Sequence, residues 1–176
     1  MDYETTKTCN RNEARLYAML FRATFDLPQK GPVNPLQLLD SMSSVEGFEH
    51  ISYEIVYGNS LPGNVPARGY FTEDGGYHIE IKESVYKGAY EKETGGYYMH
   101  ILHEIVHPFV DKLGFKPIFS REVTKDTPAY KRLEWIVMAI AGEIMMPYEE
   151  TQGLTIKELM KKYHVSKSAA EKRLTY

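Results

Sequence analysis

The sequence predicts an α+β domain that is mainly helical and carries a small antiparallel sheet. Long segments repeat apolar residues every three to four positions, and a shorter central region alternates apolar and polar residues. A turn of Asp and Gly joins two of the alternating segments. The 176 residues suffice for one core, and the chain has no repeat of solenoid or propeller length. We therefore expect one core with a small helical appendage.

The first helix is expected over residues 12–25. Leu16, Met19 and Leu20 recur at helical spacing there, with Arg22 among the polar positions. This pattern is typical of an amphipathic helix, and we expect the face with these three apolar residues to pack against the core.

A short helix and three strands follow. Residues 36–42 predict a helix that begins after Pro35, because proline suits the first helical turn. Residues 51–57 are rich in β-branched and aromatic side chains and predict a strand. Residues 70–72 and 77–81 flank the Asp-Gly-Gly turn and predict a hairpin, in which alternate residues of the second strand face inward.

Two long helices are expected in the second half of the chain. The first runs from about Tyr97 to Gly114, where glycine ends a helix readily. The second should have Thr127 as its N-cap and Pro128 at its first position, and should end at Pro147.

The C-terminal residues predict a helix-turn-helix-like tail. Thr155 and Glu158 form the capping-box pattern of one short helix, and Ser166 is suited to cap another. We expect residues 151–176 to be an appendage packed on a domain of residues 1–150. The tail is basic, so DNA contact is the alternative, but the rest of the chain gives it no support.

The composition of the chain bears on the cellular compartment of the protein and on its binding partners. A net charge of −3 gives no overall reason to expect nucleic acid or an anionic membrane as a partner. The longest apolar run, residues 135–141, is far shorter than the roughly 18 residues that span a bilayer. Cys9 is the single cysteine, so no disulfide forms within the chain, and the first residues do not resemble a secretory signal. We expect a cytoplasmic protein, and its oligomeric state is left open.

Residues 103–107 read HEIVH, the pattern that carries the chemistry. On a helix, the four-residue step places His103 and His107 one turn apart on one face, where two imidazoles can bind the same Zn²⁺. A catalytic zinc uses three protein ligands and leaves one position for water. Glu104 lies about 100° further round the helix, so we expect it to act on that water as the catalytic base.

The third ligand must come from another element. Glu134 and Glu143 are the acidic candidates on the second long helix, and they point to opposite sides. We prefer Glu134, because it is expected in the middle of an apolar arc where zinc would compensate its charge, whereas Glu143 is expected to be solvated. A salt bridge from Glu134 to a nearby basic residue is the alternative.

These motifs together resemble the ImmA/IrrE family of metallopeptidases. In that family an HExxH helix is followed by a glutamate thirteen residues before the proline of an LLMP-like ending. Here residues 144–147 read IMMP, and Glu134 stands thirteen positions before Pro147. The resemblance covers most of the chain. It implies a zincin-like peptidase domain that cuts a helix-turn-helix repressor of a mobile element or stress regulon.

The chain departs from the family pattern at two places. Pro108 directly follows the second histidine, and it predicts a kink or an early end of the helix. Val137 and Met138 stand where the family has alanine and a polar residue, which weakens the polar surroundings expected of the metal ligands.

The sequence thus predicts an enzyme that hydrolyses a peptide bond of a protein substrate. We expect that substrate to pair along an exposed strand at residues 77–81, as peptides do when they extend a sheet edge. The alternative function is a non-catalytic regulator that binds a repressor or DNA and uses zinc only structurally.

Overall fold

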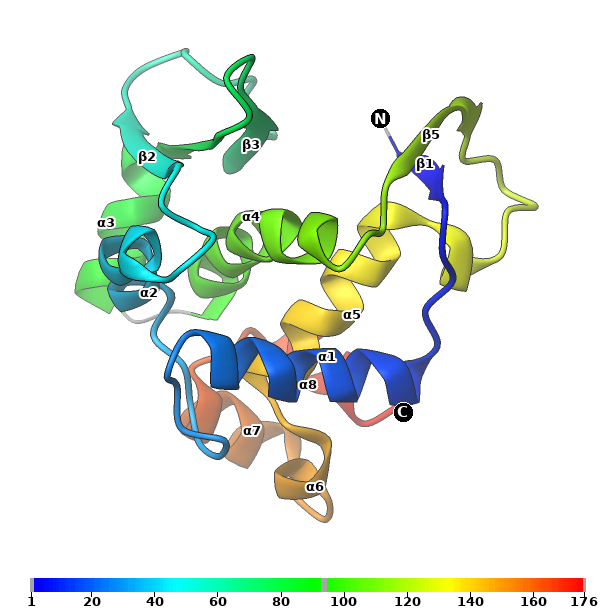
Figure 1. Cartoon of the computed structure of the whole chain (residues 1–176). Helices are drawn as coiled ribbons and strands as arrows, with labels where there is room; N and C mark the ends of the chain where they lie inside the picture. Colours follow the sequence, from blue (N-terminus) through cyan, green and yellow to red (C-terminus); the bar gives the residue numbers. More distant parts are fainter. Residues whose placement is uncertain (1, 93–94, 176) are drawn as a thin grey trace.

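The computed structural model describes residues 2–92 and 95–175, and in this part of the chain helices outweigh strands (Figure 1). The coarse prediction of an α+β chain is confirmed. The helices are α1 (Arg11–Thr24), α2 (Pro35–Ser41), α3 (Glu83–Lys92), α4 (Gly95–Lys112), α5 (Leu133–Met145), α6 (Tyr148–Thr151), α7 (Ile156–Tyr163) and α8 (Lys167–Arg173). The strands are β1 (Tyr3–Thr5), β2 (Ile51–Val56), β3 (Ala67–Phe71), β4 (Tyr77–Lys82) and β5 (Pro117–Glu122). Sequence reasoning did not predict β1, β5, α3 or α6.

The larger sheet has the strand order β2-β4-β3. The predicted hairpin is confirmed, because β3 and β4 pair antiparallel around the turn that contains Gly75. Ile79 and Ile81 are fully buried, as the alternation predicts. The prediction of an antiparallel sheet is wrong for β2, which pairs with β4 in parallel. The reason is topological, since the hairpin places β3 along one edge of β4 and β2 pairs along the other.

Helix α1 turns the opposite face to the core from the one predicted. Leu16, Met19 and Leu20 are 64%, 57% and 46% exposed, whereas Ala14 and Ala18 are buried. Small side chains let the axis of α1 approach its neighbour α5 closely, and that contact decides the orientation.

Arg22 is the largest departure from the polar face expected on α1. Its guanidinium is buried and donates to the carbonyl of Ile144 at 3.2 Å and to that of Gly31 at 2.8 Å. Backbone carbonyls therefore take up the donors of a side chain that the sequence pattern places in solvent. Burial lowers the pKa of Arg22.

Helix α4 passes through Pro108 and continues to Lys112, so the predicted early end is wrong. The glycine ending is confirmed, because Gly114 has a φ of 86° and its N–H donates to the carbonyl of Asp111. The predicted start of the next helix is wrong. Pro128 is extended, a short 3₁₀ turn (Ala129–Lys131) follows, and α5 begins at Leu133.

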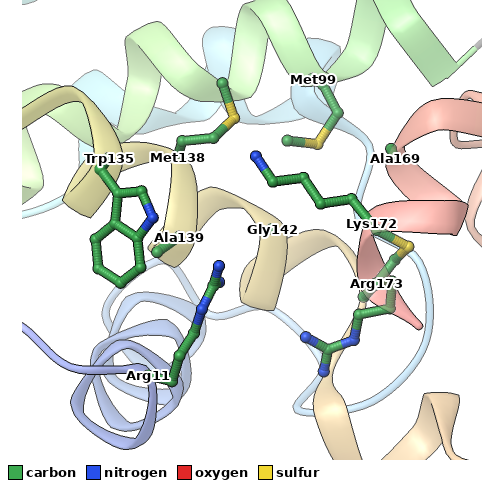
Figure 2. A pocket seen from close by; sticks show the side chains of 10 residues that line it. Arg11, Met99, Trp135, Met138, Ala139, Gly142, Ala169, Lys172 and Arg173 are labelled. Carbon is green, nitrogen blue, oxygen red and sulfur yellow. The ribbon is translucent and has the colours of Figure 1, made fainter. Parts of the chain in front are cut away.

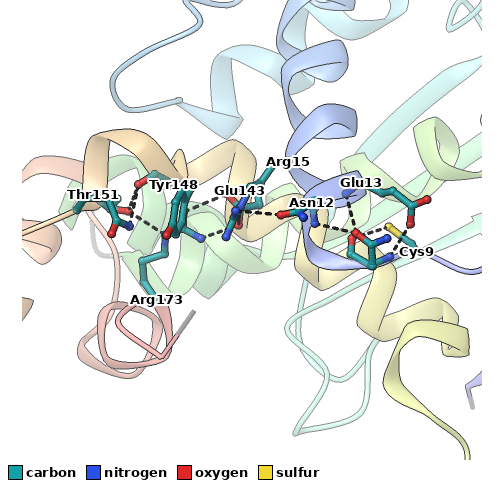
Figure 3. Close-up of polar contacts among 10 residues, drawn as sticks. Cys9, Asn12, Glu13, Arg15, Glu143, Tyr148, Thr151 and Arg173 are labelled. Carbon is teal, nitrogen blue, oxygen red and sulfur yellow. Dashed lines mark hydrogen bonds and ion pairs between the residues drawn. The ribbon is translucent and has the colours of Figure 1, made fainter.

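The predicted tail helices are confirmed as α7, with its capping box of Thr155 and Glu158, and α8, capped by Ser166. The tail is anchored by Arg173, which is buried and forms a two-pronged ion pair with Glu143 at 2.7 and 3.0 Å (Figure 3). The same arginine donates to the hydroxyl of Thr151 at 3.0 Å. The appendage therefore packs on the end of α5.

A small apolar pocket of about 90 Å³ lies where α5 meets α8 and the start of α1. Figure 2 shows Met99 and Met138 along one side of the pocket. The side chains of Arg11 and Lys172 extend into the pocket. Within residues 2–92 and 95–175, no helix is long and apolar enough to cross a bilayer.

Candidate metal centre

Helix α4 presents both histidines of the HEIVH motif on one face. The Nε2 atoms of His103 and His107 lie 3.2 Å apart. Apolar residues occupy the other faces of the helix, because Leu102, Ile105 and Val106 are fully buried. The core therefore holds the apolar residues of α4, and the two imidazoles project from another face of the helix.

Helix α5 brings Glu134 to the same point from the other side. Its carboxylate oxygens lie 3.1 Å from Nε2 of His103 and 3.7 Å from Nε2 of His107. One nitrogen or oxygen of each of these three side chains lies within 4.8 Å of the others. The structure thus brings together the three residues that the sequence analysis selected as metal ligands.

The distances between the three side chains are close to those around a tetrahedral zinc ion, with Oε2 of Glu134 nearer to His103 and Oε1 nearer to His107. Zinc bonds of about 2.0–2.2 Å at tetrahedral angles place neighbouring ligand atoms about 3.3 Å apart. An imidazole nitrogen has either one hydrogen or one lone pair, so Nε2 of His103 cannot satisfy both His107 and Glu134 by hydrogen bonds. One cation between the three atoms would satisfy all of them.

In the described part of the chain, the second ring nitrogen of His103 lacks the hydrogen bond that usually orients a metal-bound histidine. Its Nδ1 atom is buried and has no hydrogen-bond partner among the described residues. Metal-bound histidines usually donate this second N–H to a carboxylate or carbonyl.

The protonation of the cluster follows from burial and from the neighbouring carboxylates. Burial, followed by the charge of His103, lowers the pKa of His107 to about 4, so its imidazole is neutral at pH 7. Burial also opposes the charge on His103, but the hydrogen bond to Glu134 and the charges of Glu104 and Glu134 outweigh it and raise its pKa. Burial likewise opposes the charge of Glu134, yet the two histidines keep its pKa below the usual value.

Glu104 lies beside the cluster and is held by the sheet. The N–H of Gly69 on β3 donates to Oε2 of Glu104 at 2.8 Å. Burial raises the pKa of this carboxyl, although His103 and the Gly69 N–H act in the other direction. A carboxylate with a raised pKa is a better proton acceptor at neutral pH.

Tyr77 is a site residue that sequence reasoning missed. Its ring is buried, and it shares with Glu104 and His107 the wall of a cleft of about 560 Å³. A Cβ atom on Gly69 would overlap the Tyr77 hydroxyl, so any larger residue at that position would displace the Tyr77 ring. Burial and the charges of Glu104 and Glu134 raise the pKa of Tyr77, which keeps its hydroxyl protonated. No sequence signal distinguished this residue from the other 13 of the 14 tyrosines.

The cleft has two further walls. The edge strand β3 contributes Tyr70 and Phe71, and the β1–β5 ribbon contributes Tyr3 and Phe119. The rings of Tyr3 and Phe119 meet edge to face with centroids 5.3 Å apart, and Phe119 is 75% exposed. The predicted metal ligands thus lie between a strand edge and an aromatic surface.

The prediction that residues 77–81 form an exposed strand is wrong. These residues belong to β4, which is the central strand, and both of its edges are paired. The free edge near the candidate centre belongs to β3. Because N–H groups alternate in direction along a strand and that of Gly69 points to Glu104, Phe71 also presents its N–H to this side.

The expected surroundings of the two glutamates on α5 are reversed. Glu143 was expected in solvent but is 3% exposed, and besides Arg173 it has Arg15 at 3.6 Å. The Glu134 side chain is 43% exposed, although its place beside the histidines is the one predicted. The reason is that α1 and the tail cover the far end of α5, which sequence periodicity cannot detect. His100, one turn before His103 on α4, is exposed and lies outside the cluster.

Comparisons with known proteins inform the fold and leave the activity open. No family model matches the sequence, and no curated protein matches it. A solved structure of a "Mycobacterium tuberculosis transcriptional regulator" is similar, with a TM-score of 0.57 and 18% sequence identity. The similarity covers 94% of this chain and 48% of that one, so the chain spans about half the length of this neighbour. The two proteins share a fold.

Proposed function

We propose that this chain is a zinc-dependent endopeptidase with a zincin-like domain of the ImmA/IrrE type. The observation that carries the proposal is the meeting of His103, His107 and Glu134 at distances that one metal ion could bridge, beside Glu104 and in an open cleft. A closed structural site needs four protein ligands, whereas this cluster offers three among the described residues.

His103, His107 and Glu134 would hold the ion. When bound, zinc polarises a carbonyl and makes water more acidic. Glu104 then accepts the proton of the attacking water and passes it to the leaving amine. The hydrogen bond from Gly69 holds this carboxylate at the wall of the cleft.

Tyr77 would stabilise the negative charge that develops on the scissile carbonyl oxygen. Its hydroxyl is protonated, lies against Gly69 and belongs to the wall of the same cleft. A donor held in place before the reaction lowers the barrier, because it need not reorganise as charge forms.

The substrate would be an extended segment of a protein. The free edge of β3 can pair with it through main-chain groups such as those of Phe71, and the Tyr3–Phe119 surface can contact its apolar side chains. A helix-turn-helix repressor is the target class that the family resemblance suggests. The structural neighbour is also named as a transcriptional regulator.

The alternative function is a regulator without catalysis that binds a repressor or DNA and uses zinc structurally. The name of the structural neighbour suits this function equally well. The two functions make different demands on Glu104. An endopeptidase needs its carboxylate as a proton acceptor, whereas a structural zinc site needs no proton acceptor.

Substitution of Glu104 by Gln tests the proposal. We expect purified wild-type protein to contain zinc and to cleave helix-turn-helix repressors or a quenched-fluorescence peptide library. Glu104→Gln should keep the zinc and lose cleavage by about a hundredfold or more. Asp111→Asn is the matched control, because it removes a carboxylate from the same helix and cleft. A wild-type protein that binds zinc and cleaves neither substrate would favour the alternative function, and one without zinc would refute both.

A further inference from the structure

Residues 2–9 lie against the ends of both helices that carry the predicted ligands. β1 pairs antiparallel with β5, and Glu4 forms an isolated bridge with Arg132, directly before α5. Figure 1 shows β1 beside β5, above the first turns of α5. The N–H of Cys9 donates to the carbonyl of Tyr130 at 3.0 Å, so the contact extends along the approach to α5.

Asp2 caps the helix that presents Glu134. The N-cap residue of α5 is Arg132, whose side chain gives no cap hydrogen bond and donates to the carbonyl of Thr127 at 2.7 Å. Instead, Oδ1 of Asp2 accepts the N–H of Glu134 at 3.1 Å. The first turn of a helix leaves such N–H groups without partners, and a carboxylate there also interacts favourably with the helix dipole. The cap therefore comes from a distant part of the sequence and acts on the ligand residue itself.

The same segment holds the end of the histidine helix. Nζ of Lys7 donates to the carbonyl of Leu113 at 2.6 Å, and Oγ1 of Thr6 donates to that of Gly114 at 3.0 Å. These carbonyls follow the last residues of α4, where helices lack intrahelical donors and attract cations. The N–H of Thr6 also donates to the carbonyl of Lys116 at 2.9 Å, so the segment is bound to the residues that follow α4 as well.

We propose that residues 2–7 are a positioning device for the metal centre. Thr6 and Lys7 hold the end of α4, and Asp2 fixes the backbone of Glu134 at the start of α5. Ligands from the two helices then meet with little reorganisation when an ion binds. Asp2 contacts the main chain of the ligand residue, so it is a positioning residue rather than a ligand. This inference rests on the proposed zinc binding.

The test measures zinc affinity in the full chain by competition with a chromophoric chelator, below the unfolding temperature of the metal-free protein. Asp2→Ala should weaken zinc binding roughly tenfold, the size seen when partners outside the ligand shell are lost. Asp2→Ser should restore most of the affinity, because its hydroxyl can accept the same N–H. A merely structural role would lower the unfolding temperature of the Ala variant and leave its zinc affinity unchanged.

Glu4→Gln is the matched control. It removes a carboxylate two residues further along the same N-terminal segment, where the side chain lies 3.9 Å from Arg121, and the zinc affinity of this variant should stay within about twofold of wild type. Equal affinities of the wild-type and Asp2→Ala proteins would overturn the inference while leaving the proposed function intact. A wild-type protein that binds no zinc would refute the proposed function instead.

Discussion

Helix α5 carries one carboxylate near each end, and the two have opposite surroundings. Glu134 projects into the cleft toward two imidazoles, one of which burial keeps neutral at pH 7. Glu143 is buried between the guanidinium groups of Arg173 and Arg15 (Figure 3). A carboxylate paired with fixed protein cations has a structural role, whereas one that faces two imidazoles in a cleft can share an exchangeable cation with them.

The largest effect is expected at the cleft end. Glu134→Gln should reduce zinc affinity by about a hundredfold or more, because an amide is a poor replacement for a charged oxygen ligand. The stability of the metal-free protein should change by less than about 0.5 kcal/mol, since the side chain is partly exposed. Metal titration and denaturant unfolding of the same preparation measure both quantities. A large loss of metal-free stability would make Glu134 as structural as Glu143 and remove the contrast.

The buried end should behave in the reverse manner. Glu143→Ala leaves Arg173 buried without its partner, so we expect a loss of about 3–5 kcal/mol in the free energy of unfolding. Zinc affinity should remain within about twofold, because Glu143 lies outside the ligand cluster. The exposed Glu149 provides a control, and Glu149→Ala should be close to neutral. If the folded Glu143→Ala protein bound zinc much more weakly, the Glu143 end of α5 would affect metal binding at the Glu134 end, and the two ends would not be independent.

Tyr77→Phe sharpens the description of the cleft. Loss of the hydroxyl should lower kcat about tenfold to a hundredfold while KM and zinc content stay close to wild type. Tyr70→Phe removes a hydroxyl from the same cleft and sheet but from an exposed ring, and it should have little effect. Equal kinetics of the two variants would remove Tyr77 from the proposed reaction.

The smallest effect concerns the thiol of Cys9. Burial, with a smaller contribution from Glu13, raises the pKa of Cys9 to about 12, so the thiolate is scarce at pH 8. We expect a thiol reagent to label the native protein far more slowly than the unfolded chain. Glu143→Ala should accelerate labelling through more frequent unfolding, while Glu134→Gln should not. Rapid labelling of the wild-type protein would mean that this side of the molecule opens without global unfolding.

The local elements near the predicted chemistry could be read from the sequence. The four-residue step of His103 and His107 on a helix, the hairpin around Gly75 and the capping box at Thr155 depend on neighbouring residues alone. The position of Glu134 relative to Pro147 was also readable, from a family resemblance. Such features are set by backbone geometry and by hydrogen bonds over short sequence distances.

Tertiary packing decided the rest. Arg22 is buried although helical periodicity places it in solvent, and Glu143 is covered by a tail that returns to α5. Tyr77 reaches the cleft because β4 lies beside β3, and Asp2 caps α5 across almost the whole chain. Periodicity shows that two faces of a helix differ, but burial depends on which neighbour arrives and how closely. The sequence by itself therefore determined the candidate ligands, and only the assembled fold determined what surrounds and positions them.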